Sequence, residues 1–340
     1  MSNRVGTICL TSNQGLSYLV KDFYDNGIIT DVLVQKHPRF KNNPVWYGKE
    51  SCDLDVYSGY PFTNNAPSHI LEKIETFLDN IDVLFLFETP FYMQALLIAK
   101  QKNIPIVFMP MYECTPYPIH CDVYLSPSDL DYKYNSTLYK DKKNIRINVP
   151  VPNEVKWKER KVAKTFIHNS GNGGTYGRNG TAELIEAMKY VNSPIELIIR
   201  SQTKDFSCED PRVKVYNKHI PFEQLWSTGD VFIFPEKFNG LSLPIQEAFS
   251  SGLGIMCGNR MPMNNWLPKE LLINVSSYEK KNIVNIKFDS AIFDPKDIAK
   301  SIDEWYNKDI SHFSNQGKKW LSENNWQTLG PEYHNILKGL

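Results

Sequence analysis

Short apolar runs alternate with stretches of helical spacing along the first half of the chain. Runs of strand length stand at residues 5–11, 31–35, 83–87, 104–109 and 123–125. Patterns typical of helices lie between them, at residues 17–24, 68–78 and 91–100. Strands that alternate with helices need crossover connections, which produce a parallel sheet. We therefore predict a doubly wound α/β domain.

The second half repeats this alternation. Its expected strands are residues 165–168, 195–199, 213–216, 231–234, 255–257 and 272–275, and its expected helices are 181–190, 221–226, 297–306 and 313 to the end. Alternating prolines in Val149-Pro-Val-Pro-Asn153 stiffen the chain between the halves. We predict two facing Rossmann-like domains, residues 1–150 and 151–312, with a ligand cleft between them above the strand ends. Residues 313–340 are expected to form a C-terminal helix that packs back toward the N-terminal domain.

Length and composition agree with two such domains. A chain of 340 residues, with 41% hydrophobic and 22% charged residues, is typical of a globular protein with more than one core. No apolar run approaches membrane-spanning length, and the N-terminus passes straight into a strand without the apolar core of a signal peptide. We expect a cytoplasmic protein without stable membrane insertion. The six cysteines are scattered, without a CxxC pair or Cys/His ligand spacing, so we expect free thiols.

Net charge is zero, and the balance holds in both halves. Residues 1–150 have 14 basic against 16 acidic side chains, and residues 151–340 have 24 against 22. This argues against broad nucleic-acid binding driven by counterion release. One local cluster combines cations with aromatic rings, which suits phosphate contact and base stacking, although a solvated surface is the simpler interpretation. It contains Lys36, Arg39, Lys41, Trp46 and Tyr47.

The most informative stretch is residues 232–252, an apolar strand followed by a loop and a helix. Asn239-Gly240 supplies a tight turn, and Pro244 suits the first turn of a helix. First-turn amides and the helix dipole favour a phosphate. Glu247 lies one turn further in, where its carboxylate can accept hydrogen bonds from two adjacent hydroxyls, as on a ribose. This pattern predicts a nucleotide-sugar site.

A second candidate is the glycine-rich stretch of residues 168–180, between a strand and a helix. Gly173 and Gly174 let backbone amides approach phosphate oxygens closely. A surface loop without a ligand is the alternative interpretation. The downstream Glu247 motif favours phosphate binding.

The stretch 232–252 resembles the signature of retaining glycosyltransferases of the GT-B fold, specifically glycosyltransferase family 4. That family has two glutamates eight positions apart, and Asn239 stands in place of the first. Glu236, three residues earlier, could substitute if the loop bends differently. Leu241 and Ser242 replace the usual Phe and Gly. The residues that match are Gly240, Leu243, Pro244, Glu247, Ala248 and Gly252.

The resemblance implies a set of donor-binding residues. In the family, an Arg and a Lys-Gly pair contact the donor diphosphate; Arg178 matches the first, and Asn179-Gly180 stands where the second is expected. Arg200, at the end of the next strand, could replace the missing cation. The turn with His219 and Ile220 would hold the base by backbone contacts. Gly15, after the first strand, would approach the transferred sugar.

The catalytic residues are less clearly marked. Family members often have a His-Asp pair near residues 110–114, and no histidine stands there. Glu88 and Glu113 end neighbouring strands, so either could orient the acceptor hydroxyl or act as a base; capping is an equal alternative. Asp53-Leu-Asp55 and Asp129-Leu-Asp131 lack the apolar strand that should precede a metal-binding Asp-x-Asp motif, so we expect no metal.

We therefore predict a glycosyltransferase that moves a hexose or pentose from a nucleoside diphosphate sugar, expected to be a UDP-sugar, to a hydroxyl acceptor with retention of configuration. No cofactor besides the donor is expected. The acceptor could be a saccharide or, as for phage-type DNA glycosyltransferases, a hydroxymethylated base. Asn239 and Asn179, where charged residues are usual, leave open a non-catalytic sugar-nucleotide binding protein.

Overall fold

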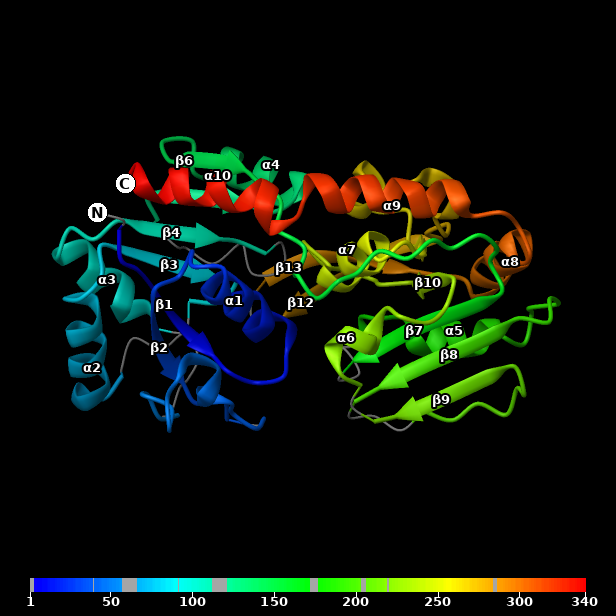
Figure 1. Cartoon of the computed structure of the whole chain (residues 1–340), viewed down its shortest axis with the longest axis horizontal. Helices are drawn as coiled ribbons and strands as arrows, with labels where there is room; N and C mark the ends of the chain where they lie inside the picture. The colour runs from blue at the N-terminus through cyan, green and yellow to red at the C-terminus, as the bar shows by residue number, and fades with distance from the viewer. Residues whose placement is uncertain are drawn as a thin grey trace. The chain divides into compact units, whose positions relative to one another are not determined.

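The computed structural model describes residues 3–38, 40–56, 66–90, 92–111, 121–171, 177–202, 206–218, 220–283 and 286–340. The chain divides into two compact units (Figure 1). The first unit contains residues 1–150 and 326–340, and the second contains residues 151–325.

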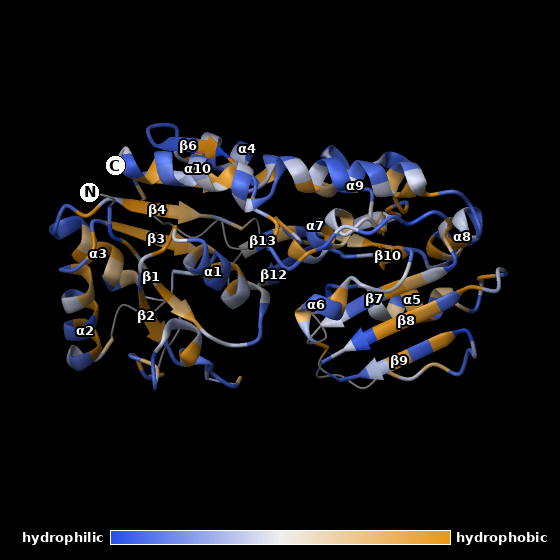
Figure 2. Ribbon diagram, in the orientation of Figure 1, coloured by the Kyte–Doolittle hydropathy of each residue, from blue (hydrophilic) through white to orange (hydrophobic). Residues whose placement is uncertain are grey.

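The first unit is built on a six-stranded sheet with the order β2-β1-β3-β4-β5-β6, in which neighbouring strands pair in parallel. The strands are β1 (Val5–Leu10), β2 (Asp31–Gln35), β3 (Val83–Phe87), β4 (Ile106–Met109), β5 (Val123–Ser126) and β6 (Lys143–Arg146). Every residue of β1, β3, β4 and β5 is buried, as a parallel sheet covered on both faces requires. Figure 2 shows β1, β3 and β4 mostly in hydrophobic colours.

Helices cover both faces of this sheet. The helices of the first unit are α1 (Gly15–Asp25), α2 (Ser68–Leu78), α3 (Met93–Gln101), α4 (Asp129–Leu138), α10 (Trp326–Lys338) and the short 3-10 helix η1 (Pro44–Tyr47). Apolar side chains of α2 and α3 pack in one core cluster with the strands. On α1, the Phe23 ring centroid lies 5.0 Å from those of Phe87, Trp326 and Tyr333, so α10 is part of this unit's core.

Hydrogen bonds hold α10 in the first unit. The Trp326 indole N–H donates to Asp22 at 2.7 Å, and the Tyr333 hydroxyl donates to the Asn148 carbonyl oxygen at 2.9 Å. The C-terminal segment therefore completes the unit that the N-terminal segment begins.

The second unit has a five-stranded parallel sheet with the order β11-β10-β7-β8-β9. Val231 and Ile233 pack into one core cluster, with α5 and α8, while Phe232 and Phe234 pack into another, with α7. The strands are β7 (Thr165–Gly171), β8 (Glu196–Ser201), β9 (Val213–Asn217), β10 (Val231–Phe234) and β11 (Gly254–Cys257). The helices are α5 (Thr181–Ala187), α6 (Phe222–Leu225), α7 (Leu243–Ser250), α8 (Pro295–Trp305), α9 (Ser311–Glu323), η3 (Met263–Asn265) and η4 (Lys269–Leu271).

Several elements differ from the sequence-based expectation, and α4 and β6 are among those that were not predicted. Residues 272–275 form no strand; Ile273 makes only an isolated bridge to Gly258. The helix expected from residue 313 to the end is two helices, α9 and α10. A polar antiparallel hairpin, β12 (Ser277–Ile283) with β13 (Ile286–Ile292), was not predicted, because its charged sequence lacks the apolar alternation of a strand.

No helix within the described residues is long and apolar enough to cross a membrane.

Candidate functional site

The strand order of the second unit marks one place where a ligand is expected. From β7, the chain first builds β8 and β9 on one side and then β10 and β11 on the other. The connections therefore reverse direction between β7 and β10. Ligands of open α/β sheets bind outside the carboxyl ends of the strands at such a switch point. The segments that follow β7 and β10 are residues 177–180 and 235–242.

These two segments are in close contact. Gly180 has a φ of +70°, and a Cβ there would lie 2.3 Å from the carbonyl oxygen of Pro235. Only glycine fits this position, because any side chain would collide with backbone. The Lys237 amide donates to the carbonyl oxygen of Arg178 at 2.8 Å. The loop after β10 is therefore fixed against residues 178–180.

Glu236 is at the centre of a buried charge cluster beside this contact. Its side chain is 2% exposed, and its carboxylate oxygens lie 3.3 Å from Arg260 Nη2 and 3.9 Å from Arg178 Nε. Asn239 Nδ2 donates to Glu236 Oε1 at 2.8 Å. Burial raises the pKa of Glu236 above its usual range, and the two arginines and Asn239 oppose that shift. The cluster contains two guanidinium groups and one carboxylate, which suits an anionic ligand.

Arg260, which holds the loop together, was not predicted as a site residue. Its Nε donates to the Glu236 carbonyl oxygen at 2.8 Å, and its Nη1 donates to the carbonyl oxygens of Met261 at 2.9 Å and Asn239 at 3.3 Å. Arg260 comes three residues after β11, which pairs with β10. A basic residue just past an expected strand, at the same sheet edge as the motif, was the available signal.

Asn239 makes two hydrogen bonds that together need an amide side chain. Its Nδ2 donates to Glu236, and its Oδ1 accepts from the Leu241 amide at 3.0 Å. A glutamate could accept from Leu241 but would place a second carboxylate beside Glu236. The presence of Glu236 three residues earlier therefore accounts for the asparagine.

The helix α7 begins in a strained conformation. Ser242, its N-cap, has φ 53° and ψ 68°, in the left-handed region where the family usually has glycine. The amides of Ile245 and Gln246 donate to the Ser242 carbonyl oxygen, and Pro244 has no N–H. The Leu243 amide has no acceptor among the residues that the structure describes. The first turn of α7 therefore offers one amide, fewer than the sequence suggested.

Replacing Ser242 with glycine is expected to stabilise the protein by about 1 kcal/mol, because the left-handed conformation costs an L-residue ~1–2 kcal/mol and glycine loses part of that gain in entropy. Urea unfolding measures the change. Ser251→Gly is the matched control, since Ser251 ends the same helix with φ −78° and should lose stability. A loss of stability in both variants would contradict the strain at Ser242.

Glu247 lies on α7 and is 9% exposed. Its Oε2 accepts from the indole N–H of Trp226 at 3.1 Å. Trp226 follows α6, in the segment that the resemblance assigns to the nucleotide base. A carboxylate can accept several hydrogen bonds, so a ribose hydroxyl can add to the one from Trp226. The sequence analysis missed Trp226, although a buried tryptophan needs an acceptor for its N–H.

The remaining candidates of the second unit differ in their surroundings. The Arg178 side chain is partly exposed, with its guanidinium 5.8 Å from the centre of the Phe238 ring. Asn179 is buried and donates to the Ser170 carbonyl oxygen at 2.9 Å. Arg200 is also buried, and its guanidinium donates to the Leu225 carbonyl oxygen and to Thr228 Oγ1. Leu241 is buried, Ile220 is partly exposed, and Gly240 completes the turn before Leu241.

Five candidates lie outside the described residues: Arg39, Glu113, Gly173, Gly174 and His219.

The hairpin β12–β13 packs against the loop that follows β10. The Phe288 ring lies 4.5 Å from the Phe238 ring, and the Ala291 amide donates to the Lys237 carbonyl oxygen at 2.8 Å. Phe238 in turn lies beneath the Arg178 guanidinium. The unpredicted hairpin thus contributes to the position of a candidate donor-binding cation.

His168, on β7, is buried and neutral. Its Nδ1 lies 2.9 Å from the Ile233 carbonyl oxygen, which can only accept, so Nδ1 carries the proton. Its Nε2 lies 2.8 Å from Thr181 Oγ1. Burial lowers the pKa of His168 to about 4. We therefore assign it a structural role at the switch point.

Because His168 is buried in its neutral form, we expect the protein to lose stability in acid. In the unfolded chain it binds a proton near pH ~6.5, whereas in the folded protein it does so only near pH 4, so stability is full above ~6.5 and falls as the pH drops. Between about pH 7.5 and about pH 5, the loss from this group is on the order of 2 kcal/mol. His168→Gln keeps a donor and an acceptor without titrating, so urea unfolding should show a smaller pH dependence. An equal dependence in both proteins would contradict a neutral buried His168.

The first unit has its own switch point, between β1 and β3. Gly15 begins α1 directly after β1, and Glu88 follows β3. Glu88 has a φ of 50°, which is uncommon for a residue other than glycine, and its amide donates to the Met109 carbonyl oxygen at 2.9 Å. Such strain is often found at functional positions, which agrees with Glu88 as a candidate.

The described residues of the cation-aromatic cluster in the first unit differ in their exposure and in their partners. Lys36 lies 4.0 Å from Asp55, and Lys41 is exposed. Trp46 is partly exposed, whereas Tyr47 is buried, with its ring edge-on to Tyr24.

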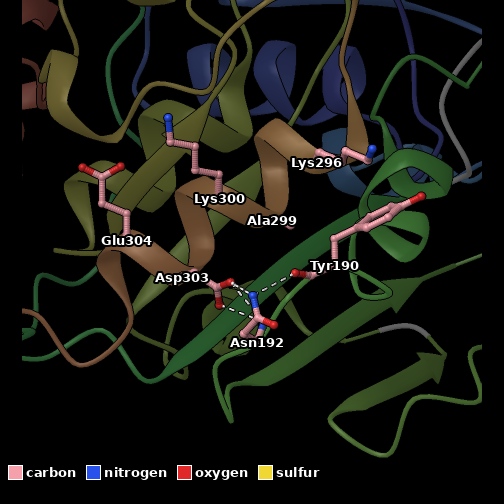
Figure 3. A pocket seen from close by; sticks show the side chains of 7 residues that line it. All are labelled: Tyr190, Asn192, Lys296, Ala299, Lys300, Asp303 and Glu304. Atoms are coloured by element: carbon pink, nitrogen blue, oxygen red, sulfur yellow. Dashed lines mark hydrogen bonds between the residues drawn. The ribbon is translucent and has the colours of Figure 1, made fainter.

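The second unit also has a groove, which none of its candidate donor-binding residues lines (Figure 3). Tyr190 and Asn192 precede β8, so the groove adjoins the amino ends of the strands rather than their carboxyl ends. The Asp303 carboxylate accepts from the amides of Asn192 and Ser193, and Lys296 lies over the Tyr190 ring. These contacts describe the packing of α8 on the neighbouring turn.

Among the described residues, no group of three or more His, Cys, Asp or Glu side chains is arranged to hold a metal ion. Of the two Asp-x-Asp sequences, Asp53 accepts from Lys49 and the Val34 amide, and Asp131 accepts from Ser128.

No protein-family model matches the sequence, and no curated protein does. Solved structures do match. HepE of Anabaena, in complex with UDP and glucose, has a TM-score of 0.68 at 12% identity, covering 99% of this chain and 100% of that chain. With the same coverage, the lipopolysaccharide outer core galactosyltransferase WaaB has a TM-score of 0.62 at 13% identity, and the sucrose-phosphate synthase of Thermosynechococcus elongatus 0.61 at 11%. The likeness establishes the fold, which is the GT-B fold that the sequence predicted.

Proposed function

We propose that the protein is a glycosyltransferase that moves a sugar from a UDP-sugar to a hydroxyl acceptor, with retention of configuration. The observation that carries the proposal is the charge cluster at the β7–β10 switch point. The cluster contains the partly exposed Arg178, and the same loop leads into α7, which carries the Glu247 carboxylate. The likeness in fold to HepE, whose structure contains UDP and glucose, supports a sugar nucleotide as the ligand.

Each part of the cluster has a role in holding the donor. Arg178 and the Leu243 amide bind the diphosphate, and the positive end of the α7 dipole adds to their field. Glu247 accepts hydrogen bonds from the ribose hydroxyls. Glu236 and Arg260 hold the loop in place, and Arg260 adds a second positive charge beside Glu236.

The proposed reaction needs little from the protein beyond charge and position. The acceptor oxygen forms a bond to the anomeric carbon, the bond from that carbon to the diphosphate oxygen breaks, and the acceptor proton passes to the departing phosphate oxygen. Negative charge grows on the diphosphate as this bond breaks. Arg178 and the Leu243 amide stabilise that charge. Glu88 is proposed to orient the acceptor hydroxyl.

A donor panel tests the proposal. The protein is incubated with UDP-, GDP- and ADP-sugars, with and without acceptors, and release of the nucleoside diphosphate is measured. We expect release from a UDP-sugar, and proton NMR of the product should show the donor's anomeric configuration. An inverted product would overturn the retaining mechanism. Donor binding without release would indicate a binding protein instead of an enzyme.

A further inference from the structure

An aromatic surface lies at the carboxyl edge of the sheet in the first unit. We define it by Tyr18, Trp46, Asn13 and Asn43. Tyr18, on α1, is 37% exposed, and Trp46, on η1, is partly exposed. Their ring centroids are 5.1 Å apart with the planes at 37°, so the two rings form one tilted pair.

Hydrogen bonds fix this surface next to the β1 loop. Asn43 Nδ2 donates to Asn13 Oδ1 at 3.1 Å and to the Thr11 carbonyl oxygen at 3.2 Å. The Tyr18 hydroxyl donates to Asn13 Oδ1 at 3.4 Å. Asn13 is itself exposed, two residues before Gly15. The surface is therefore organised in advance of binding, beside the β1–β3 switch point.

The charges in the stretch of sequence that contains Asn43 and Trp46 nearly cancel. Between residues 36 and 55 the sequence has four cations, Lys36, Arg39, Lys41 and Lys49, and three anions, Glu50, Asp53 and Asp55. Lys49 pairs with Asp53 at 2.6 Å, and Lys36 lies 4.0 Å from Asp55. A nucleic acid requires a surplus of cations for its phosphates. The three acidic side chains leave a surplus of one positive charge in this stretch.

We propose that the aromatic surface binds the acceptor, and that the acceptor is a neutral saccharide. This inference rests on the proposed function and chooses between the acceptors that the sequence left open. The apolar C–H face of a sugar ring can pack on the rings of Tyr18 and Trp46, while the exposed Asn13 amide can hydrogen-bond a ring hydroxyl. A DNA base could also stack on these rings, but its strand would meet aspartates beside the lysines.

Acceptor kinetics test this inference. Methyl glycosides of glucose, galactose, mannose and N-acetylglucosamine are compared with hydroxymethylated DNA as acceptors for the UDP-sugar that the protein uses. We expect at least one glycoside to accept the sugar and DNA to be inactive. At a saturating donor concentration, raising the salt concentration fourfold should change the KM for the glycoside little, because a neutral acceptor makes no phosphate contacts.

Variants locate the site. Trp46→Ala should raise the KM for the active glycoside by about tenfold or more, equivalent to ~1.4 kcal/mol, and Trp46→Phe should restore part of that loss. Calorimetry with UDP shows whether the variant still binds the nucleotide. Tyr132→Ala, a similarly exposed tyrosine on α4 of the same unit, is the control and should leave the KM unchanged.

The possible failures are distinguishable. Transfer to DNA but to no glycoside would overturn the inference while supporting the proposed enzyme. An unchanged KM in Trp46→Ala would also overturn it. A wild-type protein that neither binds nor hydrolyses any sugar nucleotide would overturn the proposed function itself.

Discussion

Replacing Arg260 with methionine is expected to lower the free energy of unfolding by about 3–5 kcal/mol, because it leaves a buried carboxylate without its main cation. Glu236 is 2% exposed and Arg260 is 6% exposed at the side chain, so water replaces little of the lost interaction. The change also removes the hydrogen bonds from the guanidinium to the carbonyl oxygens of Glu236, Asn239 and Met261. Guanidinium chloride unfolding measures the loss.

Two further variants separate charge from packing. Adding Glu236→Gln to Arg260→Met should recover part of the stability, because the uncompensated charge is gone. Lys280→Met breaks an exposed ion pair with Asp289 on the hairpin and should have little effect. Burial already raises the pKa of Glu236, and loss of Arg260 would raise it further. The destabilisation in Arg260→Met should therefore shrink in acid, as Glu236 binds a proton. A pH-independent loss would argue for packing alone.

Replacing Glu247 with alanine is expected to weaken UDP binding by about 10- to 100-fold, since charge-assisted hydrogen bonds contribute ~1.5–3 kcal/mol. Isothermal titration calorimetry with UDP measures the dissociation constant of each protein. The proposed contact is from the ribose hydroxyls to a carboxylate that already accepts from Trp226.

Glu247→Gln is the informative comparison. Its amide oxygen can still accept from the Trp226 N–H, so the stability of the protein should be unchanged. The negative charge that accepts from the ribose hydroxyls is lost. We expect its affinity to lie between those of the wild type and Glu247→Ala. UDP affinity that is unchanged in both variants would contradict the role of Glu247 in donor binding.

The sequence predicted the strands with continuous apolar runs most accurately. Residues 83–87 and 231–234 form strands with the expected bounds, because every residue of each run is apolar and buried. The elements that it missed are polar. α4 is stabilised at its start by Ser128, whose Oγ accepts from the Asp131 amide at 3.1 Å, and the hairpin contacts the loop after β10 through Phe288 and Ala291.

The site residues that could be predicted are those that lie close together in the sequence. Glu236, Asn239, Ser242 and Glu247 share one motif, and the structure places the first three around a single turn. Arg260 and Trp226 join them only through the strand order and the packing of α7. Neither the pairing of β11 with β10 nor the direction of the Trp226 side chain can be read from a pattern of residues.

The most direct test of the central claim is a crystal structure of the protein with UDP. We expect the diphosphate beside Arg178 and the Leu243 amide, and the ribose hydroxyls within hydrogen-bonding distance of Glu247. UDP bound elsewhere on the protein, or crystals that bind no UDP at saturating concentration, would contradict a donor site at the β7–β10 switch point.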